Sequence, residues 1–304
     1  MKKQKISILV LIFVVFQTEI YSQKINSDSS NQGELEVILK KCAEYCEKLS
    51  NSVLDFVCIE NITEKFFYNY RKGHYFIYQL IETDAKNTYV YDYQLIRKDK
   101  KTREQRILLE VNGKQIKHKK APLITQRFSH ERVIFGPTGL LSQYWQQYFN
   151  YRITGDEIWN GINVIIIEAT PNDPDKVEHL YGKIWINKND YSILKIDWNP
   201  KSLGNYFNVL VLAKKFRAKP IITFSSEYGF EQKGIRFPSK YSIKEEYILN
   251  NNRLIEVLFP KGLKKINRFT MSETDVAYEN YKFFTVEYEV KYKNNLIKKT
   301  ELKY

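Results

Sequence analysis

Apolar and polar residues alternate over much of this chain, which is the pattern of β-strands that bury one face and expose the other. In residues 283–292, Phe284, Val286 and Tyr288 would share an apolar face, with Thr285 and Glu287 on the wet face. Asn and Gly residues, which accept turn conformations, separate several such stretches. The predicted strands are residues 53–67, 88–97, 106–111, 114–118, two within 156–169, two within 181–198, 221–228, 235–247, 253–259 and 283–292.

Two stretches follow the helical period instead. In residues 33–49, Ile38, Cys42 and Cys46 fall near one face with Glu and Lys on the other, which predicts an N-terminal helix. Residues 135–139 form a break, and a second helix is predicted over 140–149. Its apolar face would carry Leu141 and Trp145, with Tyr148 and Phe149 beside them.

The strongest local signal is the hairpin at residues 181–198. Two runs rich in Ile, Trp and Tyr flank the polar centre Asn187-Lys188-Asn189-Asp190. Branched and aromatic residues suit a pleated surface, and Asn and Asp suit a turn. Since composition does not shift along the rest of the chain, residues 33–304 are expected to form a single domain.

The first residues show the sequence pattern of a secretory signal peptide. Lys2, Lys3 and Lys5 precede the apolar run 6–16, and a polar stretch that could be cleaved near Ser22 follows. We therefore predict a signal peptide over residues 1–22 and a polar tether over 23–32. An uncleaved N-terminal anchor is the alternative. The predicted location is the periplasm of a Gram-negative bacterium.

The net charge of the chain limits the possible classes of binding partner only partly. Formal net charge is +13, and removal of three Lys and one Glu with residues 1–22 leaves +11. A basic surface could favour anionic lipid, acidic polysaccharide or nucleic acid. Because the basic residues are scattered and an exported protein has little access to nucleic acid, we do not expect that last partner. We expect a monomer.

No catalytic signature appears along the chain. The four His residues lack metalloprotease spacing, and neither a nucleophile elbow nor a phosphate-binding glycine loop is present. We therefore expect a non-catalytic protein without a cofactor. The three cysteines lack the tight pairing of a zinc site. Cys46 and Cys58 lie on successive predicted elements and are expected to form a disulfide, with Cys42 buried and free. Three reduced, buried thiols are the alternative.

The amino-acid sequence of the 181–198 hairpin resembles that of a recurring hairpin of the bacterial periplasmic lipoprotein-carrier superfamily, the Lol carrier and its relatives. Residues 90–98 and 135–142 also resemble segments of an exported bacterial branch of that superfamily. The resemblance implies an α+β fold: an open, strongly curved antiparallel β half-barrel with an N-terminal helix and short helices across its mouth.

This fold implies a binding or carrier protein for a lipid, an acyl chain or a lipoprotein, because the concave face of an open barrel exceeds what its own side chains fill. Candidate lid residues are Leu141, Trp145 and Phe149, and candidate wall residues are Ile184, Ile186 and Ile196. Ordinary core packing is the alternative for each. Other interpretations are an envelope regulatory or interaction module with a membrane-protein partner, and an outer-membrane β-barrel.

Overall fold

The computed structural model describes residues 32–51, 54–72, 78–98, 101–118, 121–128, 130–131, 133–173, 180–203, 207–249, 252–259, 266–286 and 301–303. The predicted signal peptide and the predicted tether, apart from residue 32, lie outside these residues. The strands are β1 (Leu54–Lys72), β2 (Tyr78–Lys98), β3 (Lys101–Val111), β4 (Lys114–His118), β5 (Phe149–Trp159), β6 (Ile162–Pro171), β7 (Gly182–Asn187), β8 (Ile193–Trp198), β9 (Lys219–Glu227), β10 (Phe230–Gln232), β11 (Ile235–Phe237), β12 (Lys240–Ile248), β13 (Arg268–Val286) and β14 (Glu301–Lys303). The helices are an N-terminal helix (residues 32–51), η2 (Val133–Phe135), α2 (Gly136–Leu141), α3 (Gln143–Gln146), η3 (Pro200–Leu203), α4 (Phe207–Phe216) and α5 (Asn252–Leu258).

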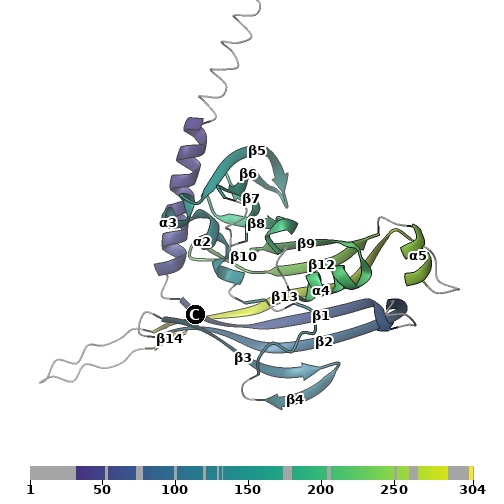
Figure 1. Ribbon diagram of the computed structural model, residues 1–304. Helices are drawn as coiled ribbons and strands as arrows, with labels where there is room; N and C mark the ends of the chain where they lie inside the picture. Colours follow the sequence, from purple (N-terminus) through teal and green to yellow (C-terminus); the bar gives the residue numbers. More distant parts are fainter. Residues whose placement is uncertain are drawn as a thin grey trace, which may run out of the picture.

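One antiparallel sheet dominates the structure. Its strands follow the order β4-β3-β2-β1-β13-β12-β9-β8-β7-β6-β5, and β14 pairs with β13 off this path. β4 and β5 stand at the two ends of that order, so the sheet is open. Figure 1 shows β5–β8 rising over the layer that β1–β3 and β13 form. The predicted fold, an open and curved antiparallel half-barrel with an N-terminal helix and short helices, is confirmed.

Strand β1 shows how alternation builds the core. Its even-numbered residues from Phe56 to Phe66 are buried, whereas the odd-numbered ones are at least partly exposed. Phe56 and Ile62 belong to the main apolar cluster, which draws on most strands of the sheet. The same buried face carries Glu60 and Glu64, both 0% exposed. Carboxylates are almost never fully buried unless they are paired, so these two residues point to a polar site inside the fold.

The N-terminal helix is confirmed and covers one end of the concave face. Its Ile38, Cys42 and Cys46 pack in the same cluster as Ile184 and Ile196 of the hairpin predicted at residues 181–198. In Figure 1 this helix, drawn in purple, stands against the β5–β8 part of the sheet, with α2 and α3 beside it. Within the described residues, no helix has both the length and the apolar character needed to cross a membrane.

A second apolar cluster closes the other end of the sheet. Leu212 and Phe216 of α4 pack there with Leu258 of α5 and with Tyr247 and Phe269 of the strands. Helix α4 was not among the predicted elements. Its position over the sheet follows from the spacing of Leu212 and Phe216, which lie one helical turn apart and share the buried face.

The prediction of a strand at residues 253–259 is wrong, because this segment forms α5. The amide of Phe259 donates to the carbonyl of Ile255 at 3.0 Å, which is a helical hydrogen bond. A short apolar run fits a strand and a buried helix equally well in sequence. Packing against the second cluster decides the outcome here.

The single helix predicted over residues 140–149 is also wrong in its bounds. Residues 136–141 form α2, and Pro137 stands in its first turn, where the missing N–H costs nothing. Ser142 is extended, with φ −66° and ψ 150°, and interrupts the helix. After the single turn of α3, Phe149 begins strand β5. The break predicted at residues 135–139 is therefore the start of a helix.

Two predicted strands have different limits in the structure. The run at residues 235–247 divides at Pro238 into β11 and β12, because proline cannot donate to a ladder. β12 then pairs with β9, and the small β10–β11 hairpin projects between them. The strand predicted at 283–292 begins much earlier, as β13 at Arg268, and its residues after Val286 lie outside the described part.

The hairpin predicted at residues 181–198 is confirmed as β7 and β8. Lys183 pairs with Asp197 and Ile184 with Ile196 across the two strands. In the turn, the Asn187 side-chain oxygen accepts a hydrogen bond from the Asn189 amide at 3.0 Å. These local bonds explain why Asn and Asp occupy the polar centre of the hairpin.

Candidate functional site

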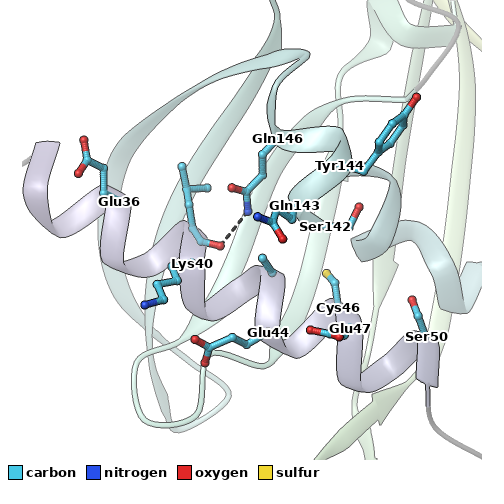
Figure 2. A pocket seen from close by; sticks show the side chains of 12 residues that line it. Glu36, Lys40, Glu44, Cys46, Glu47, Ser50, Ser142, Gln143, Tyr144 and Gln146 are labelled. Carbon is cyan, nitrogen blue, oxygen red and sulfur yellow. Dashed lines mark hydrogen bonds between the residues drawn. The ribbon is translucent and has the colours of Figure 1, made fainter.

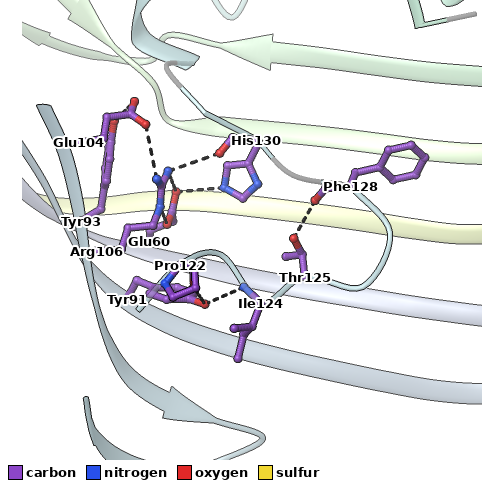
Figure 3. Close-up of polar contacts among 10 residues, drawn as sticks. All are labelled: Glu60, Tyr91, Tyr93, Glu104, Arg106, Pro122, Ile124, Thr125, Phe128 and His130. Atoms are coloured by element: carbon purple, nitrogen blue, oxygen red, sulfur yellow. Dashed lines mark hydrogen bonds and ion pairs between the residues drawn. The ribbon is translucent and has the colours of Figure 1, made fainter. Parts of the chain in front are cut away.

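The concave face is crossed by a segment that leads from β4 to α2. We call residues 121–135 the crossing segment, of which all but residues 129 and 132 are described. Its backbone is irregular as far as the short turn η2. Phe128 and Ile134, 3% and 2% exposed, insert into the main apolar cluster. The segment therefore covers the concave face without forming part of the sheet (Figure 3).

Glu60 of β1 anchors one point of the crossing segment. Arg106 of β3 donates to it from Nε at 2.7 Å and from Nη2 at 3.0 Å, a bidentate pair. The Nε2 atom of His130, in the crossing segment, lies 3.0 Å from the same carboxylate. The side chains are 0% exposed at Glu60, 8% at Arg106 and 1% at His130. Figure 3 shows both partners converging on Glu60.

The charges at this point stabilise each other. Burial raises the pKa of the Glu60 carboxyl, but the hydrogen bonds from His130 and Arg106 outweigh burial and lower that pKa to about 2. Burial lowers the pKa of the Arg106 guanidinium, and the hydrogen bonds and charge of Glu60 more than offset it, so the pKa is raised. Arg106 also lies over the ring of Tyr93, 4.5 Å from its centroid. Glu60 and Arg106 therefore form an ion pair inside the fold at neutral pH.

Two further buried carboxylates hold the crossing segment along its length. Glu64 of β1 accepts hydrogen bonds from the backbone amides of Gln126 at 3.0 Å and Arg127 at 3.2 Å. Glu245 of β12 accepts from the Arg127 guanidinium, at 2.8 Å from Nε. Burial lowers the pKa of Arg127, and Glu245 outweighs that effect and raises it. The segment is thus tied to strands on both sides of β13.

Neutral contacts complete the attachment. The Tyr91 hydroxyl donates to the carbonyl of Pro122 and accepts from the amide of Ile124, each at 3.2 Å. Nearer α2, the Tyr228 hydroxyl donates to the carbonyl of Val133 at 2.8 Å. Most of the polar anchors come from strands, and Tyr228 directly follows β9. At its start the segment also bonds to the sheet backbone, because the amide of Ala121 donates to the carbonyl of Arg106 at 3.1 Å, and beyond this point side chains hold it in place.

The anchoring residues were missed from sequence, although one signal was present. Glu60 and Glu64 occupy the apolar phase of β1, where Phe56 and Ile62 also lie. A carboxylate at a buried strand position needs a partner, and this requirement could have marked both residues. Arg106 and His130 lie 46 and 70 residues away from Glu60, and no local pattern connects them to it.

The six ligand-contact residues predicted from sequence lie together. Ile184, Ile186 and Ile196 are 0% exposed on β7 and β8. Leu141 of α2 and Phe149 of β5 belong to the same apolar cluster, and Trp145 of α3 packs against it. In the structure they are part of, or pack against, the main apolar core. Ligand contact by these residues stays a prediction.

A separate pocket of about 680 Å³ lies between the N-terminal helix and α3 (Figure 2). The Nε2 atom of Gln146 donates to the carbonyls of Leu39 and Leu141, each at 2.8 Å, and so joins the helix to α2. Apolar atoms form more of its wall than polar atoms do, although its lining residues include Glu36, Lys40, Glu44, Glu47, Ser142 and Gln143. None of the six predicted contact residues is among its lining residues.

The three cysteines are free thiols, in contrast to the expected Cys46–Cys58 disulfide. They have different neighbours, since Cys46 and Cys42 lie near Tyr151 whereas Cys58 is hydrogen-bonded to Tyr281. Burial raises the pKa of the Cys42 thiol to about 12 and raises those of Cys46 and Cys58 as well. Where the chain is described, no group of three or more His, Cys, Asp or Glu residues could hold a metal ion.

The thiols are expected to react only when the protein unfolds. A thiol reagent such as DTNB should leave the native protein unmodified, because the thiolate is the nucleophile and these thiols are buried and protonated. After denaturation without a reductant, three thiols per chain should react, one for each free cysteine. A count of one thiol would instead establish a disulfide.

Comparisons with known proteins give matches at the level of structure only. No protein-family model matches the chain, and no curated protein sequence matches it. A domain named for outer membrane lipoprotein sorting, from Vibrio parahaemolyticus, aligns with a TM-score of 0.35 and 12% identity over 81% of this chain and 91% of its own. A LolA superfamily protein from Nitrosomonas europaea aligns with a TM-score of 0.33 and 11% identity, covering 80% of this chain and 91% of its own. A DUF1329 family protein from Desulfovibrio piger has the same TM-score and identity, with 81% and 91% covered. The first two carry names of the lipoprotein-carrier group that the 181–198 hairpin resembles.

Proposed function

We propose that this protein binds an acyl chain of a lipid or lipoprotein on its concave face and carries it through the cell envelope without chemical change. The observation that supports this most is the attachment of the crossing segment. Three buried carboxylates, Glu60, Glu64 and Glu245, hold it in place through His130, the backbone amides of Gln126 and Arg127, and the Arg127 guanidinium, and none of these contacts belongs to the strand ladder.

The apolar surface beneath the segment suits such a ligand. Phe128 and Ile134 occupy the cluster from the segment's side, and Ile62, Tyr241 and Ile243 line it from the strands. If the segment moves away, the volume that its side chains fill becomes available to an alkyl chain. Burial of each CH₂ group contributes about 0.8 kcal/mol, so an acyl chain can replace the apolar contacts that the segment gives up.

Arg127→Met should loosen the cover at one point. The variant removes the cation that pairs with Glu245, while the hydroxyls of Ser272 and Tyr247 still donate to that carboxylate. Uptake of a fluorescent fatty acid, cis-parinaric acid, by the purified protein should be faster in the variant than in the wild type. Native mass spectrometry of the protein purified without detergent should also reveal a bound acyl lipid.

A matched control is the ion pair of Glu246, which is next to Glu245 on β12. Arg268→Met removes the partner of Glu246, a pair at 2.7 Å whose arginine is 54% exposed and which lies away from the crossing segment. This variant should take up the probe at the wild-type rate. If the wild type and Arg127→Met both remain folded, carry no lipid and take up no probe, the carrier function is wrong and an envelope interaction module is favoured.

A further inference from the structure

Helix α4 exposes an apolar side chain within a basic surface. Leu210 and Lys214 are spaced by four residues and so lie on one side of the helix, opposite the buried Leu212 and Phe216, and the exposed Arg217 directly follows the end of the helix. Leu210 is 45% exposed. Lys219, at the start of β9, is also exposed close to Arg217 in the chain. We call Leu210, Lys214, Arg217 and Lys219 the α4 surface.

The stretch of chain that contains α4 is one-sided in charge, although Glu256 of α5 is an exposed acidic residue of the same end of the sheet. Residues 198–226 contain five Lys or Arg and no Asp or Glu. Lys215 stabilises the position of α4, because its Nζ lies 4.8 Å from the ring centroid of Tyr70 and 5.1 Å from that of Tyr78. This contact places the end of α4 beside the end of β1, where Arg71 is exposed. The exposed acidic residue nearest to this end on β2 is Glu82, opposite Tyr68.

Helix stability alone explains only part of this pattern. Lysines in the last turn interact favourably with the negative end of the helix dipole, which accounts for Lys214 and Lys215. It accounts for neither the exposed Leu210 nor the basic residues after the helix. An apolar side chain surrounded by cations is the arrangement of a helix that lies on an anionic bilayer, since the apolar group enters the acyl boundary and the cations meet the phosphates.

We propose that the α4 surface docks the protein on anionic lipid bilayers. Lys214, Arg217 and Lys219 contact phosphate groups, and Leu210 inserts beneath them. This function goes beyond the carrier function, because it concerns an exposed surface distinct from the concave face and requires no bound acyl chain. It would bring the protein reversibly to the membrane surface.

Vesicle co-sedimentation tests the proposal with the purified full chain. The wild type should bind vesicles of phosphatidylcholine that contain a minority of phosphatidylglycerol, and should not bind vesicles of phosphatidylcholine alone. Each basic residue near an anionic surface strengthens binding about fivefold, so the triple variant Lys214→Gln, Arg217→Gln, Lys219→Gln should bind on the order of a hundredfold more weakly. Leu210→Ser should weaken vesicle binding roughly fivefold and leave retention on heparin unchanged.

The control is a triple variant with the same change in charge elsewhere. Lys183, Lys240 and Lys282 are exposed lysines of β7, β12 and β13, and their replacement by Gln should leave vesicle binding within about twofold of the wild type. The proposal is overturned if the wild type does not bind anionic vesicles, if both triple variants bind equally, or if Leu210→Ser has no effect. Circular dichroism of each variant verifies that it is folded.

Discussion

Arg106→Ala is expected to lower the free energy of unfolding by about 3–5 kcal/mol, because it leaves a buried carboxylate without its cation. Glu60 is 0% exposed and would keep only His130 as a hydrogen-bond partner among the contacts described above. Urea titration followed by circular dichroism measures the loss. A decrease below about 1 kcal/mol would show that Glu60 is solvated in the native protein.

Arg152→Ala is the matched control for this prediction. Arg152 of β5 forms an ion pair with Glu168 of the neighbouring strand β6, and its side chain is 73% exposed. Exposed pairs contribute about 0–1 kcal/mol, so this variant should be nearly as stable as the wild type. Both variants remove an arginine that pairs with a glutamate, and the two arginines differ strongly in burial.

The dependence of stability on pH gives a second measure of the Glu60 pair. The pKa of Glu60 is about 2 in the folded protein and 4.5 in the absence of interactions. The native state therefore releases the Glu60 proton more readily than the unfolded chain does, and the resulting stability is present above pH 4.5. It should be lost as the pH falls from 4.5 towards 2. In Arg106→Ala the free energy of unfolding should fall less between pH 4.5 and pH 2 than it does in the wild type.

Gly182→Ala is expected to destabilise the protein by about 3 kcal/mol or more. A Cβ atom at this position would lie 2.1 Å from the carbonyl oxygen of Asp197 and 2.9 Å from the Cα of Trp198. Both neighbours are backbone atoms of the paired strand β8, so relief requires the two strands to separate. Thermal or urea unfolding would measure the loss, and failure to yield folded protein would be its extreme form.

Gly139→Ala provides the comparison for this substitution. Gly139 lies within α2, and a Cβ atom there would have nothing within 4 Å. Alanine is the better helix former, so this variant should be unchanged or more stable by about 0.5–1 kcal/mol. If both glycine variants behaved alike, the close approach of β7 to β8 would be wrong.

The sequence was informative where burial and apolar character coincide. The hairpin of β7 and β8 was predicted in full, since Ile184, Ile186 and Ile196 are both apolar and buried. The first half of β13 was missed because its buried face includes Ser272 and Thr274. Ser272 donates to Glu245 at 2.9 Å, so the polar network that forms the site also conceals the strand. Patterns of hydrophobicity fail where a fold buries polar groups.

The candidate site depends on contacts that a single sequence does not encode locally. The Arg127–Glu245 pair joins residues 118 positions apart. Its geometry requires the sheet order in which β13 lies between β1 and β12. The six residues predicted as lid and wall candidates, by contrast, are apolar, and all of them belong to or pack against one cluster. Thus the apolar framework could be predicted from sequence, and the ionic attachment of the crossing segment could not.

The pairing of β1 with β13 also determines when this protein can fold. Asn61 and Glu279 meet across these central strands although they are 218 residues apart in the chain. Until β13 is available, one edge of β1 has no partner, and the apolar face of β1 and β2 stays open to other chains. Such distant contacts are slow to form because loop closure costs entropy before the contacts form. Strands β1 and β2 are therefore expected to stay without this partner, and to need protection from aggregation, until β13 has been synthesised.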